Sequence, residues 1–195
     1  MPPRPMNRVR PNGGSILRGI LLLARGRAAG ILEFGNSSDA LTASLAPLIA
    51  FPLVGSVMIG LGGQPGLAAL AFLSRLCGVL VLPVITEAYA RMTKREAFWL
   101  YTATALNWSF WILIPLLLMA AFLGALLVTA GVDEIRAEEI VILLLGAYML
   151  WLHWFIVRVG MRLSGWLAAG LVILTNTAIG LLTFGPDLVG LILKK

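Results

Sequence analysis

The sequence predicts an all-α fold, a polytopic integral membrane helical bundle of five transmembrane helices preceded by a short N-terminal amphipathic helix. Of the 195 residues, 59% are hydrophobic and only 12% are charged, whereas an ordinary soluble domain is about 25% charged. Three long stretches contain no Asp, Glu, Lys or Arg, namely residues 40–74, 97–132 and 163–186. Because about 20 apolar residues suffice to cross a bilayer, the chain is predicted to be one membrane domain.

The region before the first span divides into two parts. Residues 1–14 are rich in Pro, Gly and Arg and are predicted to be a disordered basic N-terminus. Residues 15–36 are predicted to form an amphipathic helix and a linker, because Ile16 and Ile20 share a helical side opposite Arg18. That pattern fits a helix lying in the membrane interface. It fits equally a helix docked on the protein's own bundle, and both alternatives stay open.

Residues 37–195 are predicted to be the membrane domain, with helix-start residues at 36–39. The third apolar run, 97–132, is too long for one straight crossing, so a single helix tilted or kinked near Pro115 is expected. The FGPD stretch, 184–187, is expected to end the last span. The spans are predicted at about 40–61, 66–87, 97–125, 139–158 and 164–184.

Five spans place most basic residues on one side of the membrane. The other side has three basic residues, Arg136, Lys194 and Lys195, and is otherwise acidic. Because Lys and Arg gather in cytoplasmic loops, we expect a multi-pass protein of a cell inner (plasma) membrane with a cytoplasmic N-terminus and a periplasmic C-terminus. Anionic lipid or a protein partner is expected to contact Arg18, Arg25, Arg27, Arg91, Lys94 and Arg95.

Three polar residues are predicted to lie near the middle of the membrane, namely Arg75, Asn107 and Asn176. If their helices face one another, Arg75 can bind an anionic group or a partner's carboxylate. Alternatively, the three residues form a structural latch, or the Arg75 side chain reaches outward toward the interface. No acidic residue lies at the same predicted depth.

Two further residues lie closer to the predicted inner face. Glu87 and Arg91 are four residues apart and are expected to pair on the helix surface. His153 is predicted at a similar level to Glu87, so a contact between them is geometrically possible, although a hydrogen-bonded helix-packing histidine is the preferred interpretation. The aromatic residues Trp99, Tyr101 and Trp166 are expected to form an interfacial belt.

The sequence lacks the motifs of several enzyme classes, including HExxH, GxSxG and Walker A. No catalytic residue, cofactor or metal ligand is therefore predicted, and the basic charge is explained by the membrane rather than by nucleic acid.

Three stretches resemble the YIP family of five-span membrane proteins, particularly its bacterial members. They are RGILLLARGRAAGILEFGNSSDAL, REAFWLYTATALNWSFWILIP and LWLHWFIVRVGMRLSGWLAAG. The resemblance implies a membrane adaptor that acts through contacts, and it supplies no catalytic residues. The Asp-Leu-Tyr-Gly-Pro-type motif of the eukaryotic members is absent.

The expected function is a non-enzymatic membrane scaffold, adaptor or accessory subunit that associates with other membrane proteins or with itself. The alternative is a small transporter or channel component whose polar site surrounds Arg75.

Overall fold

Helices make up all regular secondary structure in residues 15–193, which are the residues that this computed structural model describes, with side chains described to residue 182. Five segments are long and apolar enough to cross a membrane, so the all-α membrane bundle is confirmed. The predicted disorder of residues 1–14 lies outside the described residues. The elements are α1 (Ile16–Ala24), η1 (Ala28–Glu33), α2 (Ser38–Leu61), α3 (Pro65–Met92), η2 (Glu96–Phe98), α4 (Trp99–Ser109), η3 (Phe110–Ile112), α5 (Leu113–Thr129), α6 (Glu134–Gly160) and α7 (Gly165–Leu193).

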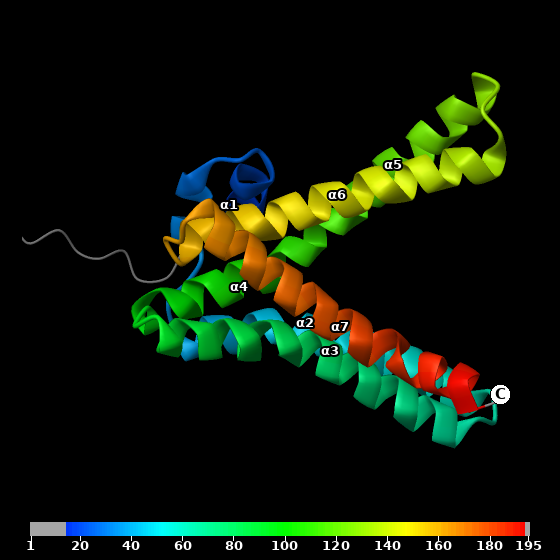
Figure 1. Cartoon of the computed structure of the whole chain (residues 1–195), viewed down its shortest axis with the longest axis horizontal. Helices are drawn as coiled ribbons and strands as arrows, with labels where there is room; N and C mark the ends of the chain where they lie inside the picture. The colour runs from blue at the N-terminus through cyan, green and yellow to red at the C-terminus, as the bar shows by residue number, and fades with distance from the viewer. Residues whose placement is uncertain (1–14, 194–195) are drawn as a thin grey trace, which may run out of the picture.

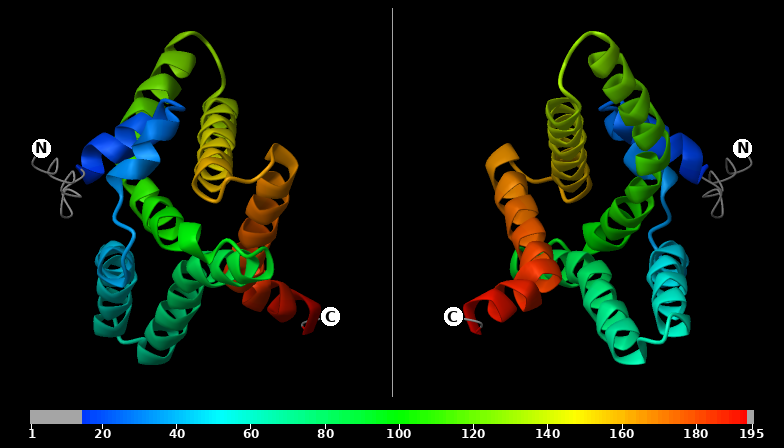
Figure 2. Two further views of the ribbon diagram at one scale, coloured as in Figure 1. Left: turned by 90° about the vertical axis from the view of Figure 1, so that its left-hand side faces the viewer. Right: turned by 90° about the vertical axis from the view of Figure 1, so that its right-hand side faces the viewer.

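The helices form two arms that diverge from a common end (Figure 1). One arm consists of α5 and most of α6, and the other consists of α2, α3 and the second half of α7. Views along the long axis show α7 passing from α6 to α3, so this helix connects the arms (Figure 2). We call the common end, formed by α1, η1, α4, the last turns of α6 and the first turns of α7, the junction.

The buried apolar core lies at the junction. Helix α4 contributes Ala105 and Leu106, and the last turns of α6 contribute Leu152 and Ile156, each at most 1% exposed. By contrast, α5 has no buried residue. The fully buried apolar side chains are therefore concentrated at one end, and the α5–α6 arm presents its apolar side chains outward.

The N-terminal segment docks on the junction. Ser15 caps α1 by accepting a hydrogen bond from the Arg18 amide at 3.4 Å. Ile20 and Leu23 are buried, whereas Leu17 is 71% exposed. Helix α1 thus packs on its own bundle with one face and leaves a second apolar face uncovered.

Close backbone approach holds α1 against η1. A β-carbon at Gly30 would lie 2.8 Å from the Gly19 carbonyl oxygen and 2.9 Å from the Leu23 amide nitrogen. An Arg18–Glu33 ion pair at 3.5 Å lies on the outside of the same contact. Only glycine fits at position 30, because backbone atoms cannot move aside as the end of a long side chain can.

The third span is interrupted where the sequence predicts a kink. Helix α4 ends at Ser109, a 3₁₀ turn follows at Phe110–Ile112, and α5 begins at Leu113. Pro115 has no N–H to donate to the carbonyl of Trp111, four residues earlier, and its ring crowds that carbonyl. The missing hydrogen bond explains why the regular α-helix breaks just before the proline.

The helix ends lie within about five residues of the predicted span ends except at the C-terminus. Ser37 caps α2 by accepting from the Ala40 amide at 3.2 Å, and Gly63, with φ of +85°, turns the chain into α3. The prediction that FGPD ends the last span is wrong, because α7 continues through residues 184–187 to Leu193. A proline is tolerated within an apolar membrane helix, and the residues that follow it are apolar enough to extend that helix.

The Gly30 contact makes a testable prediction. In purified protein, Gly30→Ala is expected to loosen the α1–η1 docking and raise the rate of tryptic cleavage at Arg25 and Arg27 about tenfold, because overpacking costs about 1–3 kcal/mol. Gly66→Ala is the matched control, since nothing lies within 4 Å of its added methyl group. Equal cleavage rates for the two variants would contradict the docking.

Candidate functional site in the membrane region

Arg75 lies in the middle of α3 and leans on α2. Its side chain is exposed on the protein surface, and its Nη1 atom would lie 3.1 Å from a β-carbon at Gly55. Within the described side chains, no hydrogen bond or ion pair involves Arg75. The guanidinium therefore lies in the space left by a glycine and not in a pocket lined by polar side chains.

The direction of the Arg75 side chain follows from the α2–α3 register. Gly60 faces Ala68, since a β-carbon at Gly60 would lie 3.5 Å from the Ala68 β-carbon. Measured along the helix axes away from the 62–64 turn, Gly55 lies about 7.5 Å beyond Gly60 on α2. The Arg75 backbone lies about 10.5 Å beyond Ala68 on α3. The guanidinium is thus displaced by about 3 Å toward the 62–64 turn, which favours the predicted outward reach over a latch in the bundle.

Asn107 makes a different contact from the one predicted. It is 1% exposed, and its Nδ2 atom donates to Ser44 Oγ at 2.9 Å. Ser44 in turn donates to the Leu41 carbonyl at 2.6 Å. Asn107 therefore links α4 to α2, not to Arg75 in α3, and its buried Oδ1 atom has no partner among the described residues.

Asn176 bonds within its own helix. Its Nδ2 atom donates to the Val172 carbonyl at 2.8 Å, and the adjacent buried Thr175 donates to the Leu171 carbonyl at 3.0 Å. The structure accordingly does not join Arg75, Asn107 and Asn176 through hydrogen bonds. The three lie on α3, α4 and α7 and each has a separate environment.

The buried hydroxyl groups share one property. Each donates to a carbonyl three or four residues earlier in its own helix, so none requires another helix to satisfy its donor. This group consists of Ser44, Ser56, Thr86, Thr102, Thr104, Ser109 and Thr175. Among buried polar side chains, Asn107 is thus unusual in bonding to another helix.

His153 packs against an aromatic ring and makes no contact with Glu87. Its ring lies edge-on to Phe110 at a centroid distance of 5.3 Å, and its buried Nε2 atom has no hydrogen-bond partner among the described residues. Glu87 instead pairs with Arg91, as predicted. His153 and Glu87 therefore do not form the contact that the sequence made possible.

A polar clamp joins the loops at the junction. Arg95 donates to the carbonyl of Met161 at 2.7 Å and to that of Arg162, which ties the α3–α4 loop to the end of α6. The Arg162 guanidinium stacks on the Phe98 ring at 4.7 Å. Cations suit this position because the carbonyls at a helix C-terminus lack partners within the helix.

Helices α4 and α6 meet closely beneath the clamp. A β-carbon at Gly160 would overlap Thr102, lying 2.8 Å from its Cγ2 atom and 3.0 Å from its Cβ atom. Tyr101 donates to the Gly160 carbonyl at 2.9 Å. We call the contacts of Arg95, Tyr101, Thr102, Gly160 and Arg162 the junction clamp.

Two residues of the predicted aromatic belt direct their polar groups into the bundle. Tyr101 donates to the Gly160 carbonyl, and Trp99 donates to the Pro83 carbonyl and to Thr86 Oγ1, both at 3.2 Å. Trp166 is 89% exposed and is the most exposed of the three.

The basic residues proposed to contact lipid or a partner have three different environments. Arg18 and Arg91 form ion pairs with Glu33 and Glu87, and Arg95 is used in the junction clamp. The other three are exposed and have no ion pair in the described part of the chain; they are Arg25, Arg27 and Lys94. These three are available to bind an anion.

Sequence reasoning missed the junction clamp. Gly160 follows an uninterrupted apolar helix and precedes a basic turn, which indicates a helix end but does not indicate which helix it contacts. Arg95 is one of several loop arginines, and nothing in the sequence distinguishes it. Pairing a helix end with a loop 66 residues away requires the three-dimensional structure.

The described residues contain no group of three or more His, Cys, Asp or Glu side chains that could hold a metal ion. Comparison of the chain with protein-family models, with curated proteins and with solved structures found no match.

Substitutions at Asn107 and Arg75 are expected to have different effects on stability. Asn107→Ala is expected to lower the free energy of unfolding in mixed micelles by about 1–3 kcal/mol, because it removes the α2–α4 hydrogen bond. Arg75→Leu is expected to leave it unchanged or raise it, since a membrane-embedded charge costs about 2.5–3.5 kcal/mol on insertion scales. A large loss of stability for Arg75→Leu would restore the latch interpretation.

The junction clamp makes a second prediction for this region. Gly160→Ala is expected to lower the thermal midpoint in detergent, because the added methyl group overlaps Thr102. Gly170→Ala in α7 is the control, since its methyl group meets nothing within 4 Å. Adding Thr102→Ala to Gly160→Ala should recover part of the loss by removing Oγ1 and Cγ2. If Gly160→Ala leaves the thermal midpoint unchanged and Thr102→Ala does not raise it further, close packing of α4 on α6 is excluded.

Proposed function

We propose that the protein is a non-enzymatic integral membrane scaffold, an adaptor or accessory subunit of a membrane complex. The observation that carries this proposal is the α5–α6 arm. It extends away from the junction, and its outer part is formed by α5 and α6 alone (Figure 1). Helix α5 has no buried residue, so most of its surface is free for contacts with other membrane components.

The outer surface of this arm is apolar on both helices. Ile114 and Leu126 of α5 are each 54% exposed, and Leu143 of α6 is 72% exposed. Such side chains face lipid in an isolated chain, and helices of other proteins can pack on them without a desolvation cost. This property supports the adaptor role that the resemblance to five-span YIP proteins implies.

The proposed orientation places the junction on the cytoplasmic side of a cell inner membrane, with a periplasmic C-terminus. Exposed cations of the described residues gather at this end, in the α1 region and in the α3–α4 and α6–α7 loops. Lys and Arg near span ends favour the cytoplasmic side. The exposed Trp166, at the start of α7, fits the interface at that level.

The alternative function, a small transporter or channel component, has less support. A polar pathway requires groups that line a shared route, whereas Asn107 and Asn176 are bonded within separate contacts and Arg75 faces outward beside Gly55. Of these three residues, only Arg75 has a charge that could bind an anionic group. An enzymatic role has no constellation of acid and base groups to support it in the described residues.

A cross-linking experiment tests the scaffold proposal. A photoactivatable amino acid at Leu143, on the α5–α6 arm, is expected to give a discrete protein adduct in native membranes, and gentle purification should yield that partner, or a second copy, in stoichiometric amount. The same probe at Ile173 of α7, which is 66% exposed, is the control. A monodisperse single chain whose Leu143 probe labels only lipid would reject the proposal.

A further inference from the structure

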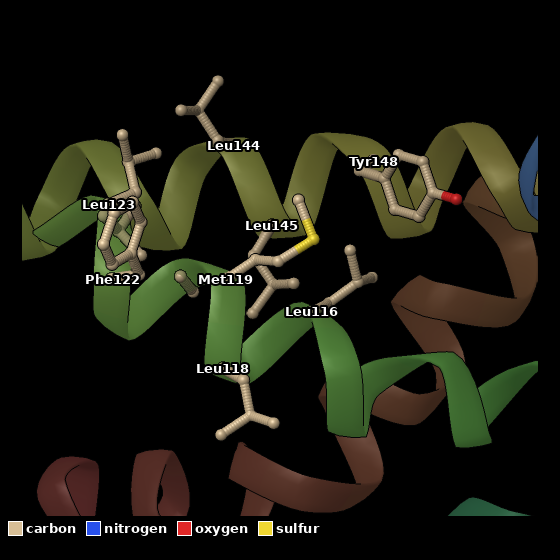
Figure 3. A pocket seen from close by; sticks show the side chains of 10 residues that line it. Leu116, Leu118, Met119, Phe122, Leu123, Leu144, Leu145 and Tyr148 are labelled. Atoms are coloured by element: carbon tan, nitrogen blue, oxygen red, sulfur yellow. The ribbon is translucent and has the colours of Figure 1, made fainter.

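A groove runs along one side of the α5–α6 arm. Its volume is about 610 Å³, and its walls are formed by Leu116, Met119 and Phe122 of α5 and by Leu145 and Tyr148 of α6, among others. Figure 3 shows Phe122 at one end and Tyr148 at the other. The sole polar group that these side chains bring, the Tyr148 hydroxyl, already donates to the Ala24 carbonyl at 2.8 Å. The groove is therefore suited to hydrocarbon.

The groove is long enough for a stretch of hydrocarbon chain. Its α6 wall runs from Val141 to Tyr148, which is about 10 Å along the axis. Because its lining offers no unpaired polar group, a hydrocarbon segment of that length leaves no polar atom of the groove unsatisfied.

Two free cations lie beside the Tyr148 end of the groove. Arg25 follows Ala24, the residue that Tyr148 contacts, and a β-carbon at Gly26 would lie 3.5 Å from the Trp151 ring. Arg25 and Arg27 are both exposed, and neither belongs to the ion pairs of the described residues. The N-terminal segment thus brings two uncompensated positive charges to one end of an apolar groove.

The position of these cations along α6 strengthens the case for an anionic ligand. Tyr148 and Trp151 precede Arg158 by ten and seven residues, which is about 15 Å and 10 Å along the helix. The backbone that carries Arg25 and Arg27 therefore lies beside a more apolar part of α6 than the cation at its end does. A cation near the hydrocarbon core is costly unless an anion accompanies it.

From these observations we infer that the groove is a specific site for an anionic phospholipid. One acyl chain lies between α5 and α6, from Phe122 to Tyr148, and the phosphate group lies on Arg25 and Arg27. The apolar groove with two cations at one end selects a lipid of this kind over a neutral lipid. This inference does not depend on the scaffold proposal, because it concerns a ligand of the isolated chain.

Native mass spectrometry of the purified full chain in neutral detergent tests the site. The probes are phosphatidylglycerol and phosphatidylcholine with identical acyl chains. The unaltered protein is expected to bind one phosphatidylglycerol at least tenfold more tightly than phosphatidylcholine. The double variant Arg25→Gln, Arg27→Gln should lose this preference, and Met119→Trp should weaken binding of both lipids about tenfold by filling the groove.

Two matched controls keep the test specific. The double variant Arg136→Gln, Arg158→Gln removes the same charge at exposed positions outside the site, and Leu117→Trp adds an indole to α5 outside the groove lining. Both controls should bind phosphatidylglycerol as the unaltered protein does, and circular dichroism should show the same helix content for all variants.

Three results would overturn the site. Equal affinity for the two lipids in the unaltered protein would show ordinary contact with bulk lipid. Loss of preference in both charge variants would show a general charge effect. Sensitivity to Arg25 and Arg27 without any effect of Met119→Trp would place the phosphate on a surface patch and leave the groove unused. A partner found by cross-linking would change none of these outcomes.

Discussion

The close contact of Gly160 with Thr102 is the packing constraint on which the arrangement of the arms depends. It brings the end of α6 onto α4, and the loops above it are then near enough for Arg95 to cap α6. Since α6 leads into α7, and α7 packs on α3, the same contact fixes where the two arms diverge. In lipid, burial of apolar surface provides little driving force for helices to associate. Close approach at small residues and hydrogen bonds between loops therefore largely determine which helices pack together.

The polar residues of the spans follow a simple rule with one exception. Buried Ser and Thr hydroxyls are satisfied inside their own helices, so they cost little wherever the helix lies. Asn107 is the exception, because its amide bonds Ser44 in another helix. Arg75 avoids burial altogether by lying beside Gly55 at the surface. The described part of the membrane region therefore contains isolated polar positions.

Sequence reasoning predicted the fold well because the bilayer constrains it strongly. Apolar length predicted the five spans, the polar residues at 36–39 predicted the start of α2, and Pro115 predicted the interruption of the third span. The end of α7 was wrong, because a proline that stops a helix in water is tolerated in an apolar one. The site was predicted less well: depth placed Arg75, Asn107 and Asn176 in one slab, but depth carries no information on which way each helix is rotated. That rotation decides that Asn107 meets Ser44 and that Tyr101 meets Gly160.

The Asn107–Ser44 hydrogen bond also has a consequence for the order in which the protein is made. Synthesis proceeds from the N-terminus, so α2 enters the membrane two spans before α4. Ser44 is therefore already in place when Asn107 is inserted, and the one buried amide that requires another helix finds its acceptor among helices made earlier. The hydroxyls of later helices bring their own acceptors with them. The chain can thus be assembled span by span without a step at which Asn107 must wait for residues still on the ribosome.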